Sequence, residues 1–238
     1  MRLLTVANPK TRKGEADGYL TGILMLSPAA TVARRSLCTS STIGCRGPCL
    51  AWQGRAGMWS KASGEYLDSA VIIHAARARR TMRYETDRAG FLGDLRRDLI
   101  ALCRAAHRHG RTPAVRLNGM SDLPSLALQM ADEHPNVQFY DYTKHPKPWL
   151  RLRPNYHLTF SRSESNGAAC VDAYRHGINV AVVFDVRKSA AMPHAWRGMP
   201  VIDGDVSDLR FLDPAPCIVG LRAKGTARHD TTGFVLRP

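Results

Sequence analysis

Three of the six cysteines lie close together near the start of the chain, with the spacing Cys38-x6-Cys45-x3-Cys49. Thiolates bind transition metals and iron–sulfur clusters, and the small residues Gly44 and Gly47 would let backbone N–H groups approach the sulfides. Three thiolates can hold three irons of a 4Fe–4S cluster, which leaves the fourth iron open to a substrate, a cofactor or another side chain. We therefore expect Cys38, Cys45 and Cys49 to bind a 4Fe–4S cluster.

Two other interpretations of these cysteines remain open. A structural zinc ion needs four ligands, usually with C-x2–4-C pairs. Only the second spacing fits that pattern and no His lies between Cys38 and Cys49, so zinc would need a remote fourth ligand. Alternatively, the three thiols are buried or free and bind nothing. Cys103, Cys170 and Cys217 lie among apolar neighbours, which predicts that they pack in the core.

Polar side chains follow nearly every segment that we predict to be a strand. The predicted strands span residues 22–26, 113–117, 137–140, 156–160, 180–184, 200–202 and 218–221. In parallel α/β sheets and barrels the active site lies at the carboxyl ends of the strands. The side chains that we expect to line a cavity for a substrate or cofactor there are Asn118, Ser121, Asp122, Asp141, Tyr142, Lys144, Ser161, Glu164, Asp203 and Asp205.

These strands alternate with segments of helical periodicity at residues 66–81, 88–107, 124–133 and 167–175. The alternation predicts a single α/β domain over residues 1–238, with parallel strands that form a partial, TIM-like barrel. An irregular lead spans residues 7–21, and a long cysteine-bearing loop spans residues 31–58, after the first strand. A loop of this length is usually functional or held in place by a ligand.

The chain is strongly basic, with 34 Lys and Arg against 20 Asp and Glu and a net charge of +14. Residues 1–112 alone carry 19 basic and 8 acidic side chains. A basic half with Trp52, Trp59 and Tyr84 among its arginines is typical of nucleic-acid binding. An Arg-rich composition with solvated surface arginines would give the same numbers. The expected partner is thus a small molecule or a nucleic acid.

Composition excludes several classes of protein. Apolar residues make up 44% and charged residues 23% of the 238 positions, which is close to the globular average and excludes disordered, collagen-like and coiled-coil chains. The chain has no long apolar run and no secretory h-region, so we expect no membrane span and a cytoplasmic protein. In that compartment the cysteines are not expected to form disulfides.

A cysteine loop after the first strand of a partial α/β barrel resembles the radical S-adenosylmethionine enzymes. Their usual loop is C-x3-C-x2-C, whereas this chain has C-x6-C-x3-C. Residues Asn118 to Asp122 stand where that family has a Gly-Gly-Glu contact to the methionine amine. The resemblance implies S-adenosylmethionine as a further cofactor, bound at the open iron, and radical chemistry.

A second resemblance extends over most of the chain. It is carried by the Cys38/Cys45/Cys49 loop, by Gly54-Arg55 and by the segments NPKTRKGEADGYLTGILMLSPA, PAVRLNGMSD, FYDYTK, NYHLTFSRSE, NVAVVF, PVIDGD and DLRFLDP. These motifs resemble the phage gene product 88 domain family. The resemblance implies a phage or prophage origin and an intracellular setting, and it brings no activity with it.

The sequence thus supports three functional hypotheses. The leading one is an iron–sulfur protein on a radical-SAM-like barrel, with redox or radical chemistry at the carboxyl ends of the strands. The alternative is a basic nucleic-acid-binding phage protein whose metal loop is structural. The third is a hydrolase in which Asp203 and Asp205 bind Mg²⁺ beside His157 or His194, although Asp-Gly-Asp is also typical of a turn.

Overall fold

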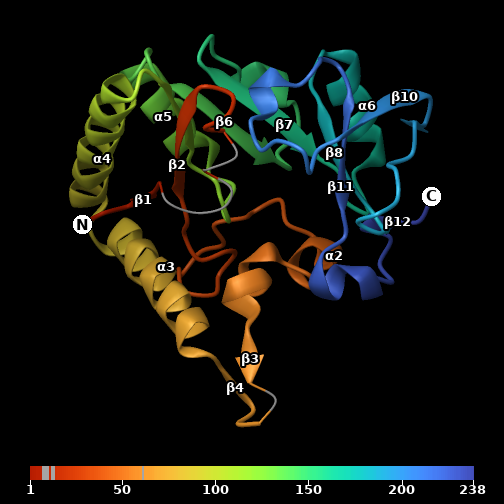
Figure 1. Ribbon diagram of the computed structural model, residues 1–238, viewed down its shortest axis with the longest axis horizontal. Helices are drawn as coiled ribbons and strands as arrows, with labels where there is room; N and C mark the ends of the chain where they lie inside the picture. Colours follow the sequence, from red (N-terminus) through yellow and green to blue (C-terminus); the bar gives the residue numbers. More distant parts are fainter. Residues whose placement is uncertain (7–10, 12–13, 61) are drawn as a thin grey trace.

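Short apolar segments pair into a mostly parallel sheet at the centre of the protein. In the computed structural model, which describes residues 1–6, 11, 14–60 and 62–238, the parallel strands lie side by side in a single order (Figure 1). That order is β2 (Tyr19–Leu24), β5 (Thr112–Arg116), β6 (Gln138–Thr143), β7 (Tyr156–Ser161), β8 (Val180–Phe184), β11 (Ile218–Arg222) and β10 (Met199–Asp203). All carboxyl ends therefore meet at one edge of the sheet, called the carboxyl edge below.

Short strands flank this parallel core. Strand β1 (Leu4–Thr5) pairs antiparallel with β2, and β9 (Ala195–Trp196) pairs antiparallel with β10. Strand β12 (Val235–Leu236) pairs in parallel with the last residues of β8. Among the described residues the path runs from β1 to β9 without closing. The fold is thus a single α/β domain with an open sheet, and the predicted barrel does not close, because short antiparallel strands occupy both edges.

Helices cover one face of the sheet. They are α4 (Arg88–Arg108), α5 (Pro124–Glu133) and α6 (Gly167–Arg175), and each carries apolar residues at three- to four-residue spacing. Phe91 and Leu95 of α4 and Met130 of α5 are fully buried against strand residues such as Phe139. This layer forms the larger part of the core.

Segment 204–217 covers the opposite face of the sheet and contains the short helix η4 (Arg210–Leu212). Leu209 packs there against Ala114 and Tyr140, and Phe211 meets the Tyr140 ring edge-on at 5.4 Å. The alternation of side chains along each strand thus separates an apolar face under the helices from a more polar face under η4.

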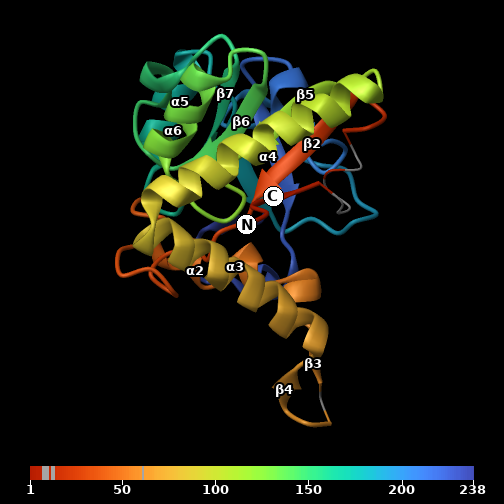
Figure 2. The same cartoon turned by 90° about the vertical axis from the view of Figure 1, so that its left-hand side faces the viewer.

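The chain between β2 and α4 folds across the carboxyl edge (Figures 1 and 2). Its first part, residues 31–58, contains the short helices α2 (Ile43–Arg46), η1 (Leu50–Trp52) and η2 (Gly54–Gly57) and is called the cysteine segment below. A hairpin of β3 (Trp59–Ser60) and β4 (Glu65–Tyr66) then projects away from the body of the protein, and α3 (Asp68–Thr86) returns to it. The remaining short helices are η3 (Pro148–Arg151) and η5 (Gly225–His229).

The predicted strands and helices are present, with shifted ends. The first strand starts at Tyr19 rather than at residue 22, because Tyr19 and Leu20 pair with Thr112 and Pro113 of β5. The predicted irregular lead over 7–21 is therefore wrong at its end, and its residues 7–10, 12 and 13 lie outside the described residues. Within the described parts of the chain, no helix is both long and apolar enough to cross a membrane.

Candidate functional site at the carboxyl edge

The cysteine segment is held over the carboxyl ends of β5, β6 and β7 by polar contacts. Glu164, three residues beyond β7, accepts hydrogen bonds from Thr42 Oγ1 (2.7 Å) and from the backbone N–H of Gly44 (2.9 Å). Burial tends to raise the pKa of Glu164, but these hydrogen bonds outweigh it and the pKa is lowered. A carboxylate predicted to line the cavity thus anchors helix α2 instead.

The loop after β5 binds the first part of the same segment. The N–H of Asp122 donates to the carbonyl of Leu37 at 2.8 Å, and the Cys38 thiol donates to the carbonyl of Met120 at 3.4 Å. His145, beyond β6, lies 3.4 Å from the side-chain oxygens of Thr39 and Ser40. Three loops at the carboxyl edge therefore position the cysteine segment.

The three predicted ligands are brought together by this arrangement. Cys38, Cys45 and Cys49 are all free and half-buried. The pKa of Cys38 is raised to about 11, mainly by burial and in smaller part by the neighbouring Asp122, Cys49 and Cys45. Burial also raises the pKa of Cys49, while the cations Arg77 and Lys144 oppose that rise. The three thiols thus lie near one another, and Cys49 also lies near Arg77 and Lys144.

A single metal ion and an iron–sulfur cluster place different demands on the spacing of three thiolates. A mononuclear zinc site draws its thiolates to about 2.3 Å from one point, whereas an iron–sulfur cluster gives each thiolate its own iron and so spaces the thiolates farther apart. Among the described residues, which include the three cysteines, no group of three or more His, Cys, Asp or Glu side chains is placed so that it could hold a metal ion. Cluster binding by Cys38, Cys45 and Cys49 therefore stays a prediction.

A buried hydrogen-bond network lies beneath the cysteine segment. Asp141 of β6 accepts from the backbone N–H of Asn118 (2.7 Å), from the Asn118 side-chain amide (2.9 Å) and from the Tyr156 hydroxyl (3.3 Å). The Asn118 side-chain oxygen in turn accepts from Ser121 Oγ at 3.0 Å. Burial raises the pKa of Asp141 to about 7, although the nearby Arg116 cation opposes the rise. Asn118, Ser121 and Asp141 thus form one buried network, and their predicted role in lining a cavity stays a prediction.

Asp122 joins this region from the loop after β5. Its Oδ2 accepts from the backbone N–H of Lys144 at 2.8 Å, and its Oδ1 lies 4.0 Å from His145 Nε2. Burial raises the pKa of Asp122 despite these partners. The Lys144 ammonium lies 5.7 Å from the centre of the Phe234 ring, so this lysine lies between the C-terminal segment and the thiols.

Two predicted cavity residues, Tyr142 and Ser161, do not join this network. Tyr142 is on the face covered by η4, where the Arg116 guanidinium stacks 4.6 Å from its ring centre. The reason is the alternation of a strand: Asp141 and Tyr142 are adjacent in β6, so their side chains point to opposite faces. Ser161 is half-buried at the end of β7, where its carbonyl accepts from the Asn166 amide at 3.0 Å.

The remaining predicted pair, Asp203 and Asp205, lies at the other end of the carboxyl edge. Arg222 of β11 donates to both oxygens of Asp203 at 2.8 Å and reaches Asp205 at 3.4 Å, and Lys224 donates to Asp205 at 2.8 Å. These carboxylates therefore belong to a second cluster, at the ends of β10 and β11, and their oxygens bind cations of the chain itself.

Several residues that the sequence analysis did not select also contribute to the carboxyl edge or to the face under η4. Arg77 of α3 donates to the carbonyl of Ala51 at 2.7 Å and so ties α3 to the cysteine segment. On the η4 face, burial and, to a smaller extent, the 1% exposed Arg210 lower the pKa of His157 to about 4. Strand alternation indicates the face of His157, but nothing in the sequence pairs it with Arg210.

The chain matches a known protein family along nearly its whole length. A family model described as gene product 88 matches residues 2–238, nearly the whole chain. Searches of curated proteins and of solved structures gave no match. The radical S-adenosylmethionine resemblance thus has no support among these comparisons.

Proposed function

Starting from the finding that this chain belongs to the gene product 88 family, we propose that Cys38, Cys45 and Cys49 bind an iron–sulfur cluster over the carboxyl edge of the sheet. The family description is consistent with a phage gene product, and it names no activity that would identify the reaction or the ligand. The observation that supports the proposal is the convergence of three free, half-buried thiols above the ends of β5 to β7.

The surroundings of the thiols suit such a cluster. Thiolates carry the charge of the bound form, and Arg77 and Lys144 lie close enough to Cys49 to oppose the rise in its pKa that burial causes. Glu164 holds the N–H of Gly44, next to Cys45, so the position of α2 is fixed before any cluster binds. Hydrogen bonds and charges around the sulfurs tune the potential of a cluster.

When bound, an iron–sulfur cluster supplies one-electron chemistry. Cys38, Cys45 and Cys49 would be its ligands, and an iron left open by three ligands could take S-adenosylmethionine, a substrate or another side chain. The buried network of Asn118, Ser121 and Asp141 lies directly below the cysteine segment. It holds the loop after β5 in place, and that loop binds Cys38.

The test is anaerobic purification followed by measurement of iron, sulfide, zinc and the absorption spectrum. We expect about four irons and four sulfides per chain and a broad band near ~400 nm in the wild type. Cys45→Ala should lose the band and most of the iron. Cys103→Ala is the matched control, because Cys103 lies on α4 and is similarly half-buried.

Each outcome decides the proposal. Loss of iron in Cys45→Ala with retention in Cys103→Ala supports it. About one zinc and no sulfide per chain would overturn the redox role and leave a structural metal. If neither variant changes the metal content, the three thiols are not ligands. A change in the spectrum of the reduced cluster on addition of S-adenosylmethionine would extend the proposal to radical chemistry.

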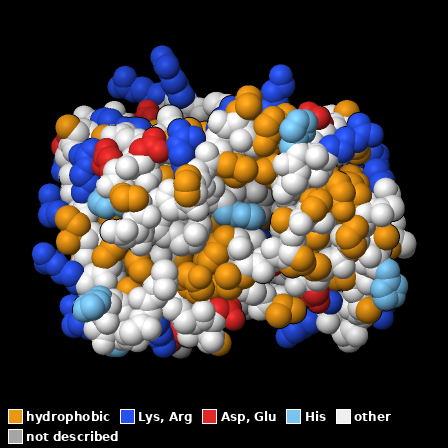
Figure 3. Space-filling view, turned by 90° about the horizontal axis from the view of Figure 1, so that it is seen from above, with side chains coloured by type: hydrophobic (Ala, Val, Ile, Leu, Met, Phe, Trp, Pro, Cys, Tyr) orange, Lys and Arg blue, Asp and Glu red, His pale blue; other side chains and the backbone are white. Residues whose placement is uncertain are grey.

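The net charge of +14 agrees with the alternative function, binding of a nucleic acid. On the face shown in Figure 3, however, Lys and Arg side chains stand mainly around the outline, and uncharged side chains fill the middle. A groove that follows a nucleic-acid backbone needs a continuous basic strip. Nucleic-acid binding is the second candidate function, and its test is an affinity that falls steeply with salt.

A further inference from the structure

A second feature of the carboxyl edge is an open pocket of about 550 Å³ beside β10 and β11. Its volume lies within the roughly 300–1,000 Å³ range of small-molecule sites. The charged side chains that line it are Lys188, Arg222, Lys224 and Arg228 against Asp203 and Asp205. Four cations thus face two carboxylates, and the pocket is called the basic pocket below.

The two carboxylates are occupied by ion pairs. Burial tends to raise the pKa of Asp205, but hydrogen bonds from Lys224 and Arg222 outweigh it and the pKa is lowered. The hydrogen bonds from Arg222 to Asp203 raise the pKa of Arg222. A divalent cation would have to displace these partners from the carboxylates, so the third sequence hypothesis, a Mg²⁺ site at Asp203 and Asp205, finds no support in this arrangement.

The Arg222 side chain forms part of the wall of the basic pocket and is held in place by several hydrogen bonds. Besides its bonds to the two carboxylates, it donates to the carbonyls of Ala190 (2.9 Å) and Arg187 (3.3 Å), in the loop after β8. Its side chain is only 13% exposed. Loops from three strands are therefore joined through one guanidinium, which makes the wall rigid without needing a ligand.

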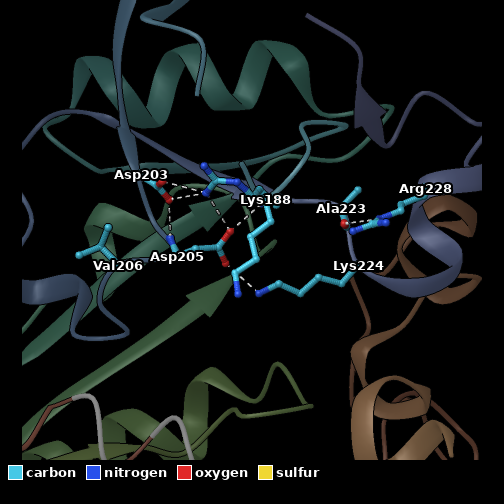
Figure 4. A pocket seen from close by; sticks show the side chains of 8 residues that line it. Lys188, Asp203, Asp205, Val206, Ala223, Lys224 and Arg228 are labelled. Carbon is cyan, nitrogen blue, oxygen red and sulfur yellow. Dashed lines mark hydrogen bonds and ion pairs between the residues drawn. The ribbon is translucent and has the colours of Figure 1, made fainter. Parts of the chain in front are cut away.

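Two cations remain available at the mouth of the pocket. Lys188 is exposed, and no hydrogen bond or ion pair is found for it among the described residues. Arg228 makes one bond, of 3.4 Å, to the carbonyl of Ala223, and most of its donors face solvent. In Figure 4 the Lys188 side chain extends toward Asp205 and Lys224, while Arg228 lies on the η5 side of the pocket.

The topology of the sheet also points to a binding site here. The chain passes from β8 to β10 across β11, and then returns to β11, so the strand order reverses at this place. Open α/β sheets bind their ligands outside the carboxyl ends where the order reverses. Lys188 follows β8, Asp205 follows β10 and Lys224 follows β11, so the pocket lies at that reversal.

We propose that the basic pocket binds a small phosphorylated molecule, with its phosphate groups held by Lys188, Lys224 and Arg228. Ammonium and guanidinium groups form strong charge-assisted hydrogen bonds with phosphate oxygens. The hollow shape and the two carboxylates in its wall favour a compact ligand over a nucleic-acid backbone, which needs an extended basic path. The inference is independent of the cluster, because none of these residues contacts the thiols.

Isothermal titration calorimetry of the full chain with inorganic pyrophosphate and with ADP tests the proposal. We expect both to bind with a Kd of about 1 mM or tighter, and adenosine, which lacks phosphate, not to bind. The double variant Lys188→Gln/Arg228→Gln should weaken binding about ten-fold or more. The double variant Arg108→Gln/Arg175→Gln is the matched control, because it removes the same charge from exposed helix ends.

Every result of this experiment supports or overturns the site. Weaker binding in the pocket variant alone supports it. Absence of pyrophosphate and ADP binding to the wild type overturns it, as does equal binding by both double variants. Tighter binding of single-stranded DNA that both double variants weaken equally would show diffuse surface charge rather than a pocket. Thermal unfolding of each variant confirms that it is folded, since both pocket side chains are exposed.

Discussion

Carboxylates stand at both ends of the carboxyl edge, in opposite environments. At the β5–β7 end, Asp122 and Asp141 are buried beneath the cysteine segment, and burial raises both pKa values. At the β10–β11 end, Asp203 and Asp205 are 34% and 23% exposed and bind Arg222 and Lys224.

The difference shows that polar residues at the ends of parallel strands can either hold loops in position or remain available to bind a ligand. At the cysteine end the polar groups satisfy one another and hold loops in position, so removing one leaves buried partners unpaired. At the basic end Asp203, Asp205 and Lys224 are partly exposed, so water can replace a lost partner and an ion pair adds little stability. The exposed cations Lys188 and Arg228 remain available for a ligand. The cysteine end should therefore be costly to mutate, and the basic end tolerant.

The largest expected effect is that of Asp141→Ala. The change would leave the Asn118 N–H, the Asn118 amide and the Tyr156 hydroxyl without their acceptor in the core. We expect the free energy of unfolding to fall by about 3 kcal/mol. Asp203→Ala, at the basic end, should cost about 1 kcal/mol or less. Urea denaturation of the two variants measures both values, and equal losses would contradict the comparison.

The sequence predicts the strands of the sheet better than it predicts which face of the sheet each side chain occupies. The run Val180–Phe184 is apolar throughout and is a buried parallel strand, as its composition predicts. Adjacency of Asp141 and Tyr142 could have placed them on opposite faces, because strand side chains alternate. Both residues were nonetheless expected to line the same cavity.

Long-range partners could not be predicted. Glu164 binds Gly44 across 120 positions, and Arg222 binds Asp203 across 19. Neither spacing is periodic, so no local pattern encodes these contacts. The sequence also does not predict that β11 lies between β8 and β10 in the sheet, because both β10 and β11 are short, mostly apolar segments. The basic pocket depends on that strand order, which is why only its two carboxylates were selected.

A second test concerns how closely α2 packs at the cysteine end. A Cβ at Gly44 would meet Thr232 Oγ1 in hard contact and lie 2.6 Å from Phe234 Cβ, whereas one at Gly47 would have only the Ile43 carbonyl, at 3.5 Å. Gly44→Ala should thus cost about 2 kcal/mol, and Gly47→Ala should change stability by less than about 0.5 kcal/mol. Chemical denaturation of the pair gives both numbers. A neutral Gly44→Ala would mean that α2 is loosely held.

The pH dependence of stability should differ in sign between the two ends. Asp141 holds its proton up to a pKa of about 7 in the folded protein and releases it near 3.8 when unfolded. The folded state therefore binds more protons between these values, and the free energy of unfolding decreases as the pH rises from about 4 to about 7. One pKa unit alone corresponds to about 1.4 kcal/mol.

Asp141→Asn should remove this decrease. The measurement is the difference in unfolding free energy between pH 5 and pH 8, for the wild type and the variant. The nearby Arg116 and Asp122 remain in both proteins, so their influence cancels to first order. Asp205→Asn is the control: its pKa is lowered, so its contribution is lost only below the ordinary pKa and should not change over this range. An unchanged slope in Asp141→Asn would show that this carboxyl is ionised throughout.

A very small change in stability is expected for Lys224→Met. This variant should distinguish folding from binding, because it should weaken ligand binding while leaving the free energy of unfolding nearly unchanged. The Lys224 side chain is 60% exposed and pairs with Asp205 at 2.8 Å. Exposed pairs contribute about 0.5 kcal/mol or less and are screened by salt, so Lys224→Met should unfold at nearly the same urea concentration as the wild type. The same variant should bind pyrophosphate about five-fold more weakly, because one phosphate ligand is gone. A loss of stability above about 1 kcal/mol would instead show that Lys224 stabilises the folded protein. The polar groups at both ends of the carboxyl edge would then serve mainly to stabilise the fold, and the two ends would differ only in burial.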